Sequence, residues 1–131
     1  MLSTNPWKYA DAWILVSLPR KGLSSVREIL SPADHHNHSV PNPDDLAEVL
    51  SRLVASGLAG AQEGRFGASP QGRAIVEGPT ERGGYDLIVE VLERLRAVPR
   101  IDGPPVVSSD ELALGYRHYG DPLWRRIWRR F

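Results

Sequence analysis

Three of the four histidines lie close together beside an aspartate, in a stretch whose side chains could bind a metal ion. His35, His36 and His38 follow Asp34, and imidazole and carboxylate groups are good ligands for zinc or nickel. The alternative is a polar turn between two helices, in which a histidine or Asn37 hydrogen-bonds to the backbone. Adjacent ligands in one loop rarely all reach the same ion, so we expect the polar turn, with no metal ligand and no cofactor.

The last ten residues, PLWRRIWRRF, combine aromatic side chains with four arginines and contain no acid. Helical spacing would place Leu123, Trp124, Ile127, Trp128 and Phe131 on one face and Arg125, Arg126, Arg129 and Arg130 on the other. Three interpretations remain open for this segment. It could lie on an anionic membrane surface, contact nucleic-acid phosphates, or pack its tryptophans into a groove of its own domain or of a partner subunit.

Recognisable catalytic motifs are absent. The chain has no cysteine, no HExxH, no GxSxG and no glycine loop with phosphate-binding spacing. Two carboxylate pairs, Asp44-Asp45 and Asp110-Glu111, each fall where a helix start favours negative charge, so helix capping explains them. We therefore predict that the protein has no catalytic residue and is not an enzyme.

Composition indicates a globular chain of 131 residues, with 41% hydrophobic and 24% charged residues. Sixteen basic residues balance sixteen acidic ones, whereas nucleic-acid-binding domains usually carry a basic excess. No apolar run approaches the roughly 20 residues needed to span a bilayer. The first residues lack the pattern of a signal peptide, and the absence of cysteine fits a cytoplasmic location.

The pattern of the chain's first half predicts three helices. Residues 7–18 are apolar nearly all round, and a second helix begins at Ser24 or Ser25 and ends at Ser31-Pro32. The third covers residues 43–56, with Asn42 as its cap and Gly57 as its stop. Its inward stripe is formed by Leu46, Val49, Leu50, Leu53 and Val54.

A short hairpin and another helix start follow the third helix. Residues 58–62 and 66–68 flank a turn at Glu63-Gly64-Arg65, which predicts two paired strands. Ser69-Pro70 then has the form of a cap and a first helical turn. Helix, two-stranded wing and helix start together form the second half of a winged-helix domain.

The phrases DDLAEVLSRLVASGLAG and GRFGASPQGRAI resemble winged-helix transcription regulators of the MarR and PadR type. In those families the wing leads into an LTPEG-like helix cap, which Ala68-Ser69-Pro70-Gln71-Gly72 matches. The preceding EILSPADHHNHSVPNPDDL resembles the turn between the second and third helices. The resemblance covers residues 7–77 and implies a mostly helical fold with a small β-hairpin wing.

The resemblance implies a dimeric regulator that binds double-stranded DNA through its third helix and wing. Ser51 and Arg52 are expected on the outward face of that helix, and Arg65 near the wing tip. The other outward residues include Asp44, Asp45 and Glu48, whose carboxylates would be repelled by phosphates. The alternative is therefore a winged-helix module that binds protein instead of DNA. The expected DNA contacts are Ser51, Arg52, Arg65, Arg125, Arg126, Arg129 and Arg130.

We divide the chain into a winged-helix domain, residues 1–77, and a helical extension, residues 78–131. Glycine and proline break the chain at residues 77–84. Residues 85–98 form a strongly amphipathic helix, which either pairs with a second copy in a homodimer or packs back on its own domain. Residues 99–109 are predicted as a linker, followed by a helix to about Tyr119 and the basic amphipathic segment 122–131.

Overall fold

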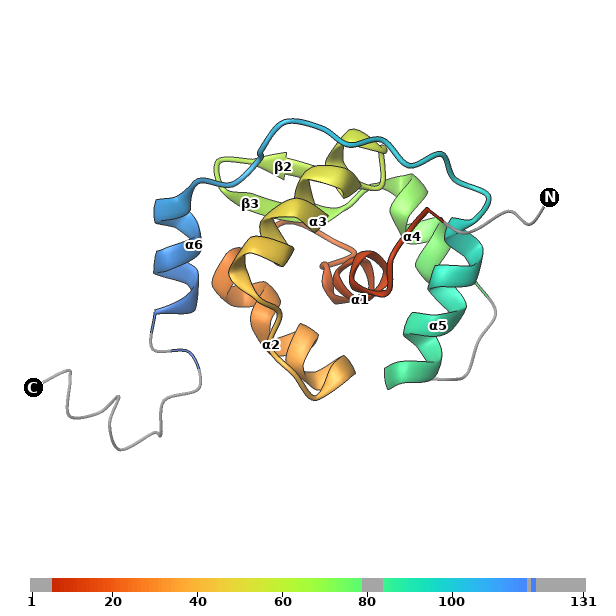
Figure 1. The fold of residues 1–131 in the computed structure, drawn as a ribbon, viewed down its shortest axis with the longest axis horizontal. Helices are drawn as coiled ribbons and strands as arrows, with labels where there is room; N and C mark the ends of the chain where they lie inside the picture. The colour runs from red at the N-terminus through yellow and green to blue at the C-terminus, as the bar shows by residue number, and fades with distance from the viewer. Residues whose placement is uncertain (1–5, 79–83, 118, 120–131) are drawn as a thin grey trace, which may run out of the picture.

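Six helices and three short strands make up the part of the chain that the structure describes. The computed structural model describes residues 6–78, 84–117 and 119. The elements in chain order are α1 (Tyr9–Ser17), β1 (Ser24–Ser25), α2 (Val26–Asn37), α3 (Pro43–Ala55), β2 (Ala59–Gln62), β3 (Arg65–Ala68), α4 (Pro70–Val76), α5 (Gly84–Leu95) and α6 (Ser109–Tyr116). Helix α1 lies at the centre, where it packs on α2, α3 and α5 (Figure 1).

Several helices begin at the capping residues that the sequence indicates. The Ser25 hydroxyl accepts a hydrogen bond from the Glu28 backbone N–H, and the Glu28 carboxylate accepts one from Ser25, which forms a capping box. Asn42 caps α3, and Ser69 caps α4. These hydrogen bonds confirm the predicted caps. The caps could be predicted from the sequence because each side chain and the amide that it caps are only two or three residues apart.

The prediction that the second helix ends at Ser31-Pro32 is wrong. Helix α2 continues through Pro32 to Asn37 and stops at His38, which has a left-handed φ of 51°. An internal proline removes one backbone hydrogen-bond donor. However, the next residue, Ala33, is fully buried, and its carbonyl accepts a 2.8 Å hydrogen bond from the buried indole of Trp13. Packing on α1 therefore outweighs the local effect of the proline.

The predicted wing is present as the hairpin β2–β3, but its turn consists of Glu63 and Gly64 alone, and Arg65, which was predicted in the turn, is the first residue of β3. Glu63 and Gly64 both have positive φ, 52° and 75°, as a two-residue type I′ turn requires. Strand β1 pairs with the other edge of β3, giving the antiparallel order β1-β3-β2. This confirms the predicted fold class, mostly helical with a small β-hairpin wing. Strand β1, only two residues long, is too short to show a periodic pattern.

Helix α5 packs on α1 of the same chain. The apolar stripe predicted within residues 85–98 is buried there, with Ile88, Val91 and Leu95 fully covered. The indole N–H of Trp7 also donates a 2.8 Å hydrogen bond to the carbonyl of Val98. Two roles were left open for this helix, and the structure shows it packed on its own domain. Its apolar stripe is therefore buried and is not available to a second copy.

Residues 99–108, here called the strap, connect α5 to α6 and pass over the outer side of α3 (Figure 1). The Ser56 hydroxyl accepts a 2.8 Å hydrogen bond from the Ile101 N–H and donates one of 3.2 Å to its carbonyl. A Cβ added at Gly103 would lie 2.6 Å from the Ala55 Cβ, so this glycine permits the close approach. The predicted linker is thus attached to α3.

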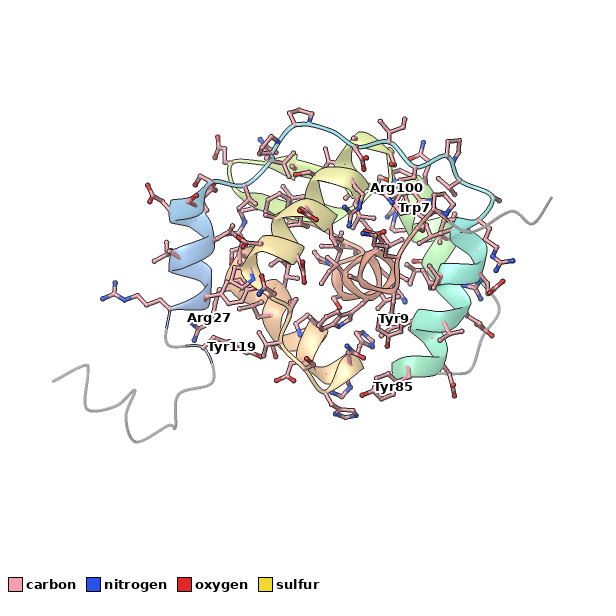
Figure 2. All side chains as sticks on the ribbon, in the orientation of Figure 1. Trp7, Tyr9, Arg27, Tyr85, Arg100 and Tyr119 are labelled. Carbon is pink, nitrogen blue, oxygen red and sulfur yellow. The ribbon has the colours of Figure 1, made fainter. Side chains whose placement is uncertain are left out.

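Helix α6 packs on α2 and, to a smaller extent, on α3. Tyr119 follows the end of α6, and the guanidinium of Arg27 lies over its ring, 5.3 Å from the ring centroid. Figure 2 shows this contact at the junction of α2 and α6. The helix is shorter than predicted, because it ends at Tyr116 and not near Tyr119, and it begins one residue earlier, with Ser108 as its cap. No helix among residues 6–78, 84–117 and 119 is long and apolar enough to cross a membrane.

Candidate functional site

The outer face of α3 is the surface to which the sequence assigns binding. Its inward stripe is buried as predicted, with Leu46, Leu50 and Leu53 fully covered. The prediction that Ser51 and Arg52 face outward is wrong, because each residue is only 8% exposed. The Ser51 hydroxyl donates to the carbonyl of Ala47, and the strap covers this end of the helix. Neither side chain projects as a groove-reading residue would.

Arg52 forms a buried ion pair with Asp11 of α1. Its Nε and Nη2 both lie 2.9 Å from Oδ1 of Asp11, whose side chain is fully buried. The second carboxylate oxygen accepts a 2.8 Å hydrogen bond from the Lys8 backbone N–H. Arg52 therefore neutralises a charge in the core and joins α1 to α3. Asp11 was missed, although it is the only acid within the mostly apolar residues 7–18, a signal that a basic partner must reach it.

The exposed remainder of α3 is acidic. Asp44, Asp45 and Glu48 are all exposed, and they lie on the first two turns of the helix. Carboxylates in the first turn interact favourably with the helix dipole, which explains why the helix tolerates them. We call these three residues the acidic face. Its charge would repel nucleic-acid phosphates and attract a basic group.

The wing arginine, Arg65, is tied back to α2 and the segment before β1. Its Nη2 lies 3.0 Å from Oε1 of Glu28 and donates a 3.2 Å hydrogen bond to the carbonyl of Leu23. Hydrogen bonds from Ser25, followed by the charge of Arg65, lower the pKa of the Glu28 carboxyl. Arg65 is half exposed, so it remains accessible although it has a counter-ion. The structure does not bring Arg65 together with Arg52.

Arg125, Arg126, Arg129 and Arg130, the remaining predicted DNA contacts, lie outside the described residues. The C-terminal segment 122–131 to which they belong was predicted as an amphipathic helix. Its three interpretations, on a membrane surface, on nucleic acid or in a groove, stay predictions.

His35, His36 and His38 lie at the end of α2 and not in a separate polar turn between two helices. His35 and His36 belong to its last turn, and His38 is its left-handed C-cap. Burial, and then the charges of His35 and Arg20, lower the pKa of His36. Within residues 6–78, 84–117 and 119, no group of three histidine or carboxylate side chains is placed to hold a metal ion.

A cavity of about 430 Å³ lies between α3 and the strap. Three cationic residues, Lys8, Arg52 and Arg100, contribute to its wall together with Glu48 and Asp102. Arg100 is held in place because its Nη1 donates a 2.6 Å hydrogen bond to the carbonyl of Pro6. Figure 2 shows Arg100 beside Trp7, at the side of the molecule where the N-terminal segment meets the strap. Sequence reasoning missed Lys8 and Arg100 because they are far apart in the chain.

Tyr116 connects α6 to the turn before α3. Its hydroxyl donates a 2.6 Å hydrogen bond to the carbonyl of Pro41. Burial, and to a smaller extent the charge of Asp45, raise the pKa of this phenol above its usual value. The folded protein therefore keeps the Tyr116 proton to a higher pH than the unfolded chain does.

We expect Tyr116→Phe to lower the free energy of unfolding by about 1 kcal/mol, since the Pro41 carbonyl loses its donor. The stability that this phenol contributes is complete below about pH 10, where the unfolded tyrosine is still protonated, and declines as the pH rises further. Urea unfolding at neutral and alkaline pH should therefore show a smaller alkaline decline for the variant. As the control, Tyr85→Phe removes an exposed hydrogen bond to the Asn37 carbonyl and should change little. A Tyr116→Phe variant as stable as the parent at both pH values would contradict this account.

Comparison of the chain with protein-family models, with curated proteins and with solved structures finds no match.

Proposed function

We propose that this chain is a cytoplasmic winged-helix protein-interaction module, which binds a basic segment of a protein partner through the acidic face of α3. The observation that carries the proposal is the cover over α3. The strap hydrogen-bonds to Ser56, and Arg52 is used in a buried ion pair. The charged side chains that α3 leaves exposed are Asp44, Asp45 and Glu48.

A helix that reads the major groove must present side chains to base edges and bring positive charge to the flanking phosphates. The acidic face does neither, and the net charge of the chain is zero. A protein partner with lysines or arginines would instead gain from these carboxylates, because complementary charge speeds encounter and fixes orientation. These arguments favour a protein partner. The family resemblance, in contrast, implies that the chain binds DNA.

The DNA hypothesis is tested with the full chain and a labelled duplex, by fluorescence anisotropy over a range of salt concentrations. The test uses a variant in which four arginines are changed to glutamine: Arg125, Arg126, Arg129 and Arg130. We expect this variant to show no salt-dependent binding to the duplex. In that background, Arg65→Gln should have no further effect. If the variant still binds with a steep salt slope, and Arg65→Gln reduces that slope by about one, DNA is the partner and our proposal is wrong.

The protein hypothesis is tested with a defined basic amphipathic probe, a synthetic peptide with the sequence of residues 122–131. We expect saturable binding that the double variant Asp44→Asn and Asp45→Asn weakens by about threefold to tenfold, in line with one or two lost charge pairs. Asp110→Asn, which changes an exposed acid at the start of α6, is the matched control and should bind as the parent does. Equal loss in both variants would mean non-specific attraction and would count against the acidic face.

A further inference from the structure

At the edge of the cavity between α3 and the strap lies a hydrogen-bond donor that no acceptor in residues 6–78, 84–117 and 119 satisfies. Arg52 is the residue concerned, and its side chain is only 9% exposed. Nε and Nη2 point to Asp11 at 2.9 Å. Nη1 is left with the exposed carboxylate of Glu48 at 3.7 Å, which is too far for a hydrogen bond. Among the described residues no acceptor bonds to Nη1.

Two further cations share the wall of the cavity. Lys8 is exposed and makes no ion pair within the described part of the chain. Arg100 has a side chain only 22% exposed, and its bond to the Pro6 carbonyl fixes its position. Arg52 is thus held by the buried Asp11, and Arg100 by a backbone carbonyl and by Asp102, whereas Lys8 has no ionic partner among the described residues.

The two acids that line the cavity are more exposed than the two arginines. The carboxylates of Glu48 and Asp102 are 68% and 72% exposed, so water screens them and their side chains can move outward. The buried Asp11 pairs with Arg52, and the exposed Asp102 pairs with Arg100 at 3.2 Å, so Lys8 is the one cation of this wall that forms no ion pair within the described residues. An incoming anion can therefore displace Glu48 from Arg52 without leaving a buried charge unpaired.

The rest of the wall is largely apolar, with Ala47, Gly103 and Pro105 contributing. A volume of about 430 Å³ lies within the range of small-molecule sites, which combine apolar walls with a few fixed polar groups. We propose that this cavity binds a small organic carboxylate. The ligand's carboxylate accepts hydrogen bonds from Arg52 Nη1 and from the Lys8 ammonium, and its apolar body packs between α3 and the strap.

Such a ligand would touch α3 and the strap together, so its binding adds to the attachment that Ser56 and Gly103 already provide. The site shares Glu48 with the acidic face but does not require the partner proposed there, and the test of that partner changes Asp44 and Asp45, which do not line the cavity. Either can fail in its own experiment while the other stands.

The experiment measures binding of 3-phenylpropionate to the full chain by isothermal titration or ligand-observed NMR. We expect saturable binding with a Kd on the order of 1 mM, as suits a ligand of this size. The neutral 3-phenylpropionamide and inorganic phosphate should bind at least about tenfold more weakly, since one lacks the charge and the other the apolar body.

Lys8→Gln tests the site without disturbing the core, because the Lys8 side chain is exposed. We expect this variant to bind 3-phenylpropionate about tenfold more weakly. The matched control, Lys21→Gln, changes the other exposed lysine, which does not line the cavity, and should bind as the parent does. The inference is overturned if the carboxylate shows no saturable binding, if the amide or phosphate binds as well, or if Lys8→Gln has no effect.

Discussion

Replacing Asp11 with alanine is expected to lower the free energy of unfolding by about 3–5 kcal/mol. Asp11 is fully buried and forms the ion pair that joins α1 to α3. Its removal leaves the guanidinium of Arg52, itself 9% exposed, without its main counter-charge. Urea denaturation followed by circular dichroism would give the difference directly.

A double variant separates the cost of an unpaired charge from a general loss of packing. Asp11→Leu combined with Arg52→Met removes both charges and fills similar volume, and such replacements are often neutral or stabilising. We therefore expect the double variant to regain most of the stability that Asp11→Ala loses. If Asp11→Ala loses less than about 1 kcal/mol, the typical loss for any substitution, the ion pair does not have the structural role that its burial indicates.

Ile88→Ala, in the middle of α5, is expected to lower the free energy of unfolding by about 2–5 kcal/mol. Ile88 is fully buried, and α5 packs mainly on α1. The substitution leaves a cavity at the centre of that contact. We expect the molecular mass in solution, measured by light scattering, to be the same for the variant and the parent, because this side chain contacts its own chain.

Val89→Ala provides the matched control, since Val89 is the next residue on the same helix and is 50% exposed. Its effect should remain within about 0.5 kcal/mol. One outcome for Ile88→Ala would contradict this role of α5. If Ile88→Ala shifts the association state while the stability of the monomer is unchanged, α5 serves a subunit interface after all.

Much of the fold follows from short-range patterns. Ser25 caps α2 through a contact within three residues, and Asn42 and Ser69 do the same for α3 and α4. The wing follows from the turn at Glu63-Gly64, where positive φ at both residues favours a tight hairpin. Each of these features depends on neighbours in the chain, and so the order of helices and hairpin could be predicted.

The site could not be predicted in the same way. Helical spacing put Arg52 on the outer side of α3, but a long side chain at the edge of a helix can turn toward either side. Its direction is fixed by Asp11, 41 residues earlier in the chain. The cavity likewise combines Lys8 with Arg100 from the strap, and no local pattern relates these two residues.

By itself, then, the sequence determined where α2, α3 and α4 begin, that a hairpin turns at Glu63-Gly64, and that the first turn of α3 is acidic. The tertiary structure decided that α2 continues through Pro32, that α5 packs on α1, and that the strap lies on α3. The physical reason is the range of the interactions involved. Caps, turns and amphipathic stripes are set by residues a few positions apart, whereas the burial of Asp11, Ala33 and Ile88 depends on which surfaces meet after folding.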